Sequence, residues 1–176
     1  MKKHLYFSLF IFHFSLFIIS CGQQKTETQE TIQTEQPVEE IHSIPVDSDS
    51  GTLMQGSHKV SYTISSQPAE ELPIVVDEDG IKYKDNRYSL DITKDGGSLF
   101  SRSFTKADFK SMLSSDFQKY GIMDGLRFSH AEEDMLYFNT CVSYPESDMS
   151  CPFILTIGPD GSYTITPDTS IDEDIL

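Results

Sequence analysis

The sequence predicts a mainly β domain, an antiparallel up-and-down meander of about eight strands that curls into a barrel or half-barrel and carries one α-helix. Short alternating apolar segments recur along its second half and are separated by turns rich in Asp, Asn and Gly. A single segment has helical spacing instead. The alternative is an α+β arrangement, an open antiparallel sheet with one helix.

Residues 1–20 have the layout of a secretion signal. Lys2 and Lys3 precede an apolar run from residue 5 to residue 19 that is too short to span a bilayer. The residues Ile18, Ile19, Ser20 and Cys21 then resemble the lipobox of bacterial lipoproteins. This resemblance implies cleavage before Cys21, acylation of its thiol and attachment to a membrane. The alternative is an ordinary secretion signal with an incidental cysteine.

Residues 21–52 have the composition of a disordered linker after the lipidated cysteine, being rich in Gln, Thr, Glu, Ser and Pro. We expect a β-rich globular domain over residues 53–168 and an acidic tail over 169–176. Residues 1–20 hold two of the 13 Lys and Arg and none of the 28 Asp and Glu, so the chain from Cys21 onward has a formal net charge of −17. Such a charge excludes nucleic acid as a partner and disfavours anionic headgroups.

Two hairpins are predicted in the first half of the domain, after the strand segments KVSYTIS and LPIVV. A two-residue turn at Asp85 and Asn86 would place Tyr83 opposite Tyr88. A turn over residues 95–97 would pair Ile92 with Phe100 and Tyr88 with Phe104. Pro73, within LPIVV, indicates an edge strand.

The segment TKADFKSMLSSDFQKYGI is the predicted helix, because its large apolar residues recur at helical spacing. Thr105 and Asp108 resemble a capping box at its start, and Gly121 resembles a Schellman stop at its end.

The last strands would form one sheet. The turn in HAEED places Phe128 opposite Phe138, and a turn tip at residues 145–147 would place Cys141 across from Cys151. That register predicts a disulfide between the two cysteines in an oxidising compartment, two free thiols being the alternative. It also predicts that Phe153 and Leu155 lie on one face of the sheet. The other face would carry a row of four apolar residues: Phe128, Phe138, Ile154 and Ile165.

No residue pattern indicates catalysis, a cofactor or a metal. His42, His58 and His130 lack a second ligand at zinc spacing, and the acidic turns at 47–51 and 77–80 lack the ligand pattern of a calcium loop. Nucleophile elbows and phosphate-binding glycine loops are missing from the sequence as well. We therefore expect a protein that is not an enzyme.

The lipobox, the polar tether and the segments DEDGIKYKDNRYSLDITKDGGSLFSRSFTKADF and PDGSYTITPD resemble an uncharacterised family of Bacteroidetes lipoproteins, grouped as a domain of unknown function. The resemblance covers most of residues 57–167. It implies a lipocalin-like β-barrel, and it implies no catalytic or binding residues.

Two functions follow as hypotheses. The first is a binding lipoprotein that holds a small apolar or mixed ligand in an interior lined by Tyr83, Tyr88, Phe128 and Phe138; large aromatic side chains can equally fill a small barrel. The second is a protein–protein interaction module of the cell envelope. Because Gly22 rather than Asp follows Cys21, we expect the outer membrane rather than the inner one. The first acidic residue, Glu27, is too far from the cysteine to resemble a surface-export signal, so we expect the periplasmic side rather than the cell surface.

Overall fold

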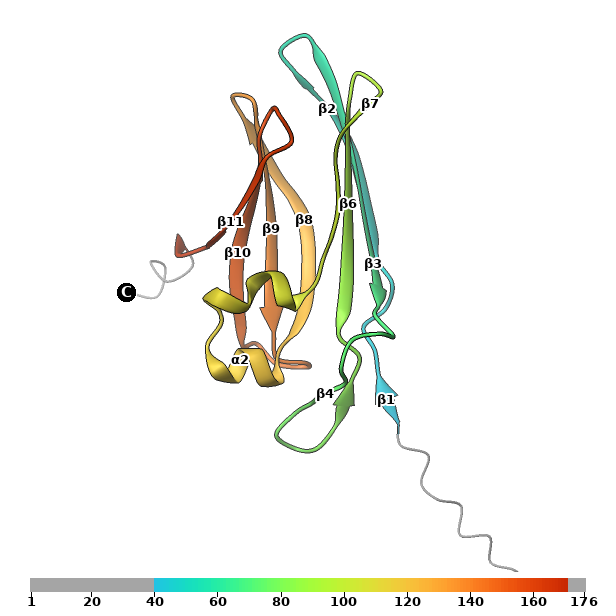
Figure 1. Ribbon diagram of the computed structural model, residues 1–176, viewed down its shortest axis with the longest axis vertical. Helices are drawn as coiled ribbons and strands as arrows, with labels where there is room; N and C mark the ends of the chain where they lie inside the picture. Colours follow the sequence, from blue (N-terminus) through green and yellow to red (C-terminus); the bar gives the residue numbers. More distant parts are fainter. Residues whose placement is uncertain (1–39, 171–176) are drawn as a thin grey trace, which may run out of the picture. The chain divides into compact units, whose positions relative to one another are not determined.

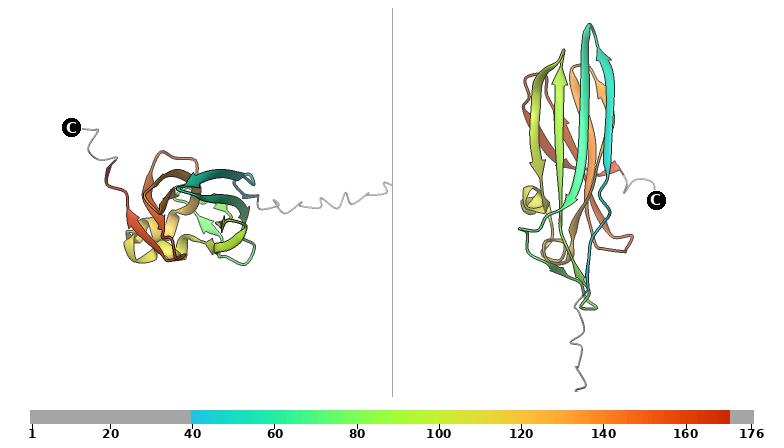
Figure 2. Two further views of the ribbon diagram at one scale, coloured as in Figure 1. Left: turned by 90° about the horizontal axis from the view of Figure 1, so that it is seen from above. Right: turned by 90° about the vertical axis from the view of Figure 1, so that its right-hand side faces the viewer.

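Two four-stranded antiparallel sheets lie face to face in this computed structural model, which describes residues 40–170 (Figures 1 and 2). One sheet has the strand order β2-β3-β6-β7 and the other has the order β11-β10-β9-β8. The predicted signal peptide, Cys21 and residues 171–176 of the predicted tail lie outside the described residues.

The first sheet is built from consecutive hairpins. Its strands are β2 (Ser48–Gln55), β3 (His58–Pro68), β6 (Asn86–Lys94) and β7 (Gly97–Phe104). The predicted pairs Ile92 with Phe100 and Tyr88 with Phe104 are confirmed. Asp95 and Gly96 both have positive φ and form a two-residue turn, because Lys94 pairs with Gly97. A bulge between Ile92 and Thr93 leaves Leu99 unpaired, and this extra residue restores the predicted pairing of Ile92 with Phe100.

The predicted linker is too long, because residues 40–52 contain β1 and most of β2. The outer edge of the first sheet is β2, and its side chains alternate between exposed and half-buried. It is held mainly by backbone hydrogen bonds to β3, with Leu53 packing on the edge of the main core cluster. An edge strand of this kind has the polar composition of a linker.

The second sheet contains β8 (Ile122–Glu132), β9 (Met135–Ser143), β10 (Ser150–Ile157) and β11 (Tyr163–Pro167). The predicted pair of Phe128 and Phe138 is confirmed. The register of β10 differs from the prediction by one residue: Phe138 lies opposite Leu155, and Ile154 lies opposite Asn139. As a result, Phe153 and Leu155 face the core and Ile154 faces away from it.

The same shift separates the two cysteines. Cys151 pairs with Val142, and Cys141 pairs with Pro152, so the cysteine side chains lie on opposite faces of the sheet as free thiols. The predicted disulfide is therefore wrong in this structure. The cause is the loop, in which the Tyr144 N–H donates to the Met149 carbonyl at 2.9 Å and leaves four residues at the tip instead of three.

A third, small sheet has the order β1-β5-β4 and consists of β1 (Ile41–His42), β5 (Lys82–Tyr83) and β4 (Val75–Val76). β4 is at its edge, as Pro73 indicates. The predicted pairing of Tyr83 with Tyr88 is wrong, because β5 pairs with β1 and β4 whereas β6 pairs with β3 and β7. The chain leaves one sheet and joins another at Asp85.

The core fills the space between the two four-stranded sheets. A second cluster, formed by Val75, Tyr83 and Ile122, lies beneath the small sheet. The main cluster takes apolar side chains from both large sheets and from the segment between them; its large members with less than 2% exposure are Ile64, Leu90, Ile92, Phe104, Phe109, Met123, Leu126, Leu136, Phe138, Leu155 and Ile157.

The mainly β, antiparallel prediction is confirmed, but the barrel does not close. Backbone pairing joins no strand of one four-stranded sheet to the other, so the arrangement matches the open-sheet alternative. Aromatic side chains close the sides instead. Tyr62 stacks on Phe128 with ring centroids 4.8 Å apart at one side, and Phe100 meets Tyr163 at 5.8 Å at the other.

The predicted helix is present as two short pieces, the 3₁₀-helix η1 (Lys106–Met112) and the α-helix α2 (Ser115–Tyr120). The Asp108 carboxylate accepts from the Thr105 backbone N–H at 2.8 Å, which confirms that part of the capping box. Gly121 has φ of −78°, so the Schellman stop is wrong. Ser114 begins α2 by accepting the Phe117 N–H.

Asp85 and Asn86 connect the start of β6 to the start of β8. The buried Asp85 carboxylate accepts the backbone N–H groups of Asn86 and Met123, each at 2.8 Å. The Asn86 side-chain amide donates to the Met123 carbonyl at 2.8 Å. Both polar groups of the Met123 backbone are thereby satisfied by one pair of side chains.

We predict that Asp85→Ala lowers the free energy of unfolding by about 3–5 kcal/mol, because it leaves two buried N–H groups without an acceptor and the largely buried Lys106 ammonium without its counter-charge. The control is Asp91→Ala on the same strand, whose exposed carboxylate accepts one bond from Ser101, with an expected loss below about 1 kcal/mol. Urea unfolding followed by tyrosine fluorescence measures both. Equal losses for the two variants would show that the Asp85 bridge adds no stability.

We also predict that Cys141 and Cys151 are both reduced. Unreduced protein, unfolded and alkylated, should yield a tryptic peptide beginning at Phe128 that carries two alkyl groups. Burial raises the pKa of both thiols, so alkylation of the native protein at pH 8 should be slower than that of the unfolded protein. A peptide without alkyl groups would demonstrate the disulfide and contradict the register of β10.

Candidate functional site

The four aromatic residues predicted to face a ligand belong to the packed interior. Tyr83, Tyr88 and Phe138 are each at most 4% exposed, and the half-buried Phe128 packs on the main core cluster. Tyr83, Phe128 and Phe138 do not line the three best-formed pockets of the described residues. Aromatic side chains therefore fill the interior instead of enclosing a ligand.

Tyr88 borders a shallow pocket of about 570 Å³ beside residues 44–47. Burial, with a further contribution from Asp124, raises the pKa of its phenol to about 12. The one cationic group of this pocket is already matched, since Arg127 forms an ion pair with Asp47, and the other charged group, Asp124, is also acidic. Val46, which also lines the pocket, is 70% exposed, so this hollow is open to solvent.

The three histidines have partners of their own. His58 Nδ1 lies 2.6 Å from an Asp95 carboxylate oxygen at an exposed turn. His130 stacks on Tyr137 at 4.5 Å, and His42 packs on Tyr83 at 5.4 Å. Within residues 40–170 no three metal-binding side chains come together.

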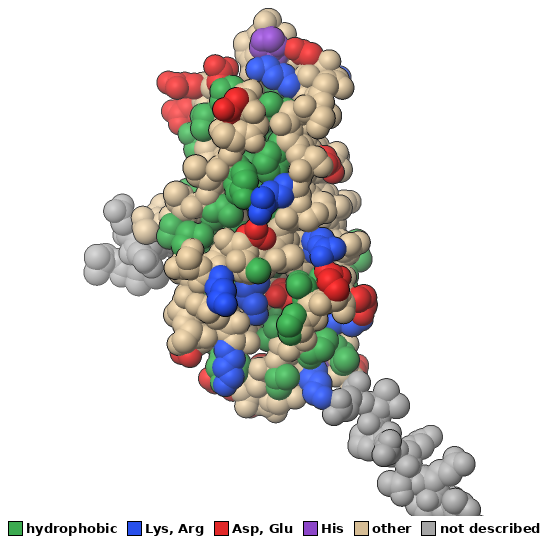
Figure 3. All heavy atoms as spheres, viewed as in Figure 1, with side chains coloured by type: hydrophobic (Ala, Val, Ile, Leu, Met, Phe, Trp, Pro, Cys, Tyr) green, Lys and Arg blue, Asp and Glu red, His purple; other side chains and the backbone are tan. Residues whose placement is uncertain are grey.

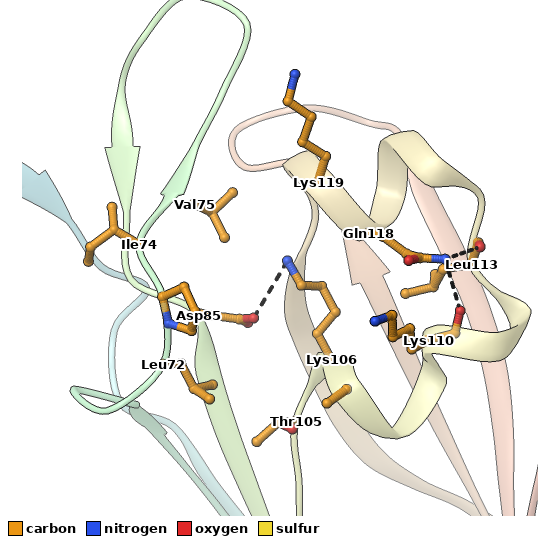
Figure 4. A pocket seen from close by; sticks show the side chains of 12 residues that line it. Leu72, Ile74, Val75, Asp85, Thr105, Lys106, Lys110, Leu113, Gln118 and Lys119 are labelled. Atoms are coloured by element: carbon orange, nitrogen blue, oxygen red, sulfur yellow. Dashed lines mark hydrogen bonds and ion pairs between the residues drawn. The ribbon is translucent and has the colours of Figure 1, made fainter.

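A pocket of about 340 Å³ lies between the segment that leads into β4 and the two helices (Figure 4). We call it the lysine-rimmed pocket. One wall is apolar and runs from Leu72 to Val75, and the opposite wall is formed by η1, Leu113 and α2. Figure 3 shows Lys and Arg side chains among hydrophobic ones on the lower part of this face. Three of the lining residues are lysines: Lys106, Lys110 and Lys119.

Lys106 reaches across the pocket from the start of η1 toward Asp85 (Figure 4). Its ammonium donates to the Gly121 carbonyl at 2.5 Å and lies 3.8 Å from the Asp85 carboxylate. The Asp85 side chain is 5% exposed and that of Lys106 is 17% exposed. Burial lowers the pKa of Lys106, and the charge of Asp85 opposes this effect.

Lys110 and Lys119 stand on the helical wall. Among the described residues, neither ammonium lies within 4 Å of a carboxylate, and Lys119 donates to the Tyr120 hydroxyl at 2.7 Å. The break between the helices is held by Gln118, whose amide donates to the carbonyls of Lys110 and Leu113 at 3.1 and 3.0 Å. This bond pattern fixes the wall that carries the two lysines.

The pocket therefore offers cationic hydrogen-bond donors beside an apolar wall. Its one carboxylate, that of Asp85, is occupied by two backbone N–H groups, so it is poorly placed to accept a proton from a substrate. The chemistry of these residues suits binding of an anion-bearing molecule better than bond cleavage.

The family model for a domain of unknown function (DUF4738) matches residues 24–165, which is most of the chain. The chain belongs to this family. The match includes every residue of the lysine-rimmed pocket and β1 and β2, so the DUF4738 domain starts well before the predicted residue 53. No protein of curated function matches the chain.

Residues 40–170 of this DUF4738 protein contain no helix that is long and apolar enough to cross a membrane. The sequence patterns described above did not predict the lysine-rimmed pocket. One signal was available, because Lys106 and Lys110 are four residues apart and lie on one side of a helical segment. The apolar wall offered no signal, since it comes from a segment more than 30 residues earlier.

Proposed function

We propose that this protein is a lipid-anchored, non-enzymatic binding protein of the cell envelope, and that it holds a small, partly apolar molecule in the lysine-rimmed pocket. The observation that carries the ligand proposal is the pocket itself. It has an apolar wall and a few charged donors, the composition typical of small-molecule sites, and about 340 Å³ lies at the lower end of their size range.

The anchor rests on the sequence. Lys2 and Lys3, the apolar run and the lipobox-like residues before Cys21 support secretion and acylation. Gly22 after the cysteine favours the outer membrane, and the distance of Glu27 from the cysteine favours its periplasmic side. The strong negative charge of the chain would keep the domain away from anionic headgroups, which leaves the lipid as the anchor.

A protein–protein interaction module is the second candidate. The edge strand β4 exposes Val76, and Ile74 just before it is also exposed, at 42% and 40%. The edge is only two residues long and is followed by the acidic turn of residues 77–79. Such a short, charged edge resists pairing with another strand, so the pocket is the better-supported site.

We expect Cys21→Ser to move the protein from the membrane fraction to the soluble or unprocessed fraction, because the acylated thiol is lost. Fractionation followed by intact mass measurement tests this. Cys151→Ser, which removes a different cysteine, is the control and should remain in the membrane. Retention of both variants with an unchanged mass would refute the lipid anchor.

A second experiment tests the pocket. Ala107 lines it, and Ala107→Phe should fill the space and abolish a ligand mass seen by native mass spectrometry of protein purified from the envelope. Ser111→Phe is the matched control, since Ser111 is exposed on the same 3₁₀-helix and does not line the pocket. Absence of bound mass from the unchanged protein, or its persistence in Ala107→Phe, would contradict the proposal.

A further inference from the structure

We infer that the ligand of the lysine-rimmed pocket is a small amphiphile with a carboxylate headgroup, which Lys106 and Lys110 hold, with Lys119 at the rim, while the apolar body lies along residues 72–75. This inference rests on the proposed function and specifies the class of molecule bound. It follows from the charge of the lining, the hydrogen-bond donors of Lys106 and the apolar wall.

The charge of the pocket has the opposite sign to that of the chain. The chain has a formal net charge of −15, with 28 acidic residues against 13 basic ones. Three ammonium groups and a single carboxylate nevertheless line this pocket. Lys110 has no carboxylate within 4 Å among the described residues. The carboxylates that attract Lys119 are those of the exposed Asp116 and Glu78 outside the pocket, so an anionic ligand would add a negative partner inside it.

Lys106 has hydrogen-bonding capacity left over. An ammonium group carries three N–H donors. Gly121 accepts one of them, and Asp85 lies at 3.8 Å, a distance of charge attraction rather than of a hydrogen bond. A carboxylate in the pocket can accept a remaining N–H, and the Asp85 pair keeps the ammonium in place before the ligand arrives.

The apolar wall accounts for the rest of the molecule. Leu72, Val75 and Leu113 line the pocket, and Val75 and Leu113 belong to the buried clusters, so their position is fixed by the core. A fully polar anion such as inorganic phosphate would leave this wall in contact with water. An apolar body of a few carbons gains free energy by covering it.

The other charged ligands fit less well. A divalent cation would be repelled by three ammonium groups and would find only one carboxylate, which already accepts two N–H bonds. An acidic peptide needs an extended groove or an open strand edge, and this pocket is a local hollow between β4 and the helices. A small carboxylate meets both the charge and the size.

Isothermal titration of the intact protein in phosphatidylcholine nanodiscs, with empty nanodiscs as the blank, tests the inference. The ligands are octanoate, octanol and octylammonium, which have the same number of carbon atoms and differ in their headgroup. We expect octanoate to bind roughly tenfold more tightly than octanol, and octylammonium to bind most weakly.

The variant pair separates the headgroup from the apolar body. Lys110→Gln with Lys119→Gln should weaken octanoate binding about tenfold and leave octanol binding within about twofold. The control is Lys59→Gln, which changes an exposed lysine on β3 outside the pocket and should alter neither.

The outcomes distinguish the two proposals. Octanol binding as tightly as octanoate, with no effect of the lysine variants, would overturn the carboxylate while preserving a small-molecule pocket. Binding of none of the three ligands, together with no bound mass in the native protein, would overturn the proposed function and this inference with it.

Discussion

The carboxylate of Asp85 is the constraint on which the arrangement of this domain depends. It ends the small sheet and begins β6, and it also accepts the Met123 N–H at the start of β8. Its backbone carbonyl accepts the Ala69 N–H at 2.9 Å, just after β3. One buried residue therefore connects the two large sheets, alongside side-chain packing and the Asn86 and Gln55 side-chain hydrogen bonds to β8 and β9. Burying this charge is favourable only because two backbone N–H donors and the Lys106 ammonium surround it.

The pocket is a consequence of the same residue. Asp85 holds the Lys106 side chain across the gap between the β4 segment and η1. Because this ion pair lines the bottom of the gap, the two walls do not close into an apolar contact. The helical wall stays in place through Phe109, whose ring meets Phe153 of β10 at 4.9 Å. Under the proposed function, ligand binding and fold stability both depend on the ion pair of Asp85 and Lys106. For this reason a test of ligand binding should substitute Lys110 and Lys119 rather than Lys106, because these substitutions leave the ion pair intact.

The sequence predicted the pairing of neighbouring strands in this fold, but not the contacts between segments that are distant along the chain. Pairs that one turn brings together, such as Ile92 with Phe100 and Phe128 with Phe138, were predicted correctly because alternation and turn residues specify them. The predicted register of β10 was wrong, because a four-residue loop and a three-residue loop have similar sequences. Asp85 and Asn86 resembled a hairpin turn, and only the tertiary partner Met123 shows their role. The pocket combines segments that no local pattern relates.

Hydrogen exchange of the Met123 backbone amide tests the central role of Asp85 most directly. This N–H is donated to a buried carboxylate, so we expect it to exchange only through global unfolding, with an exchange free energy equal to the free energy of unfolding. The Asp79 N–H, which donates to the exposed carboxylate of Asp77, is the internal comparison and should exchange rapidly. Exchange of Met123 at the rate of Asp79 would show that the bridge opens freely, and would contradict the account.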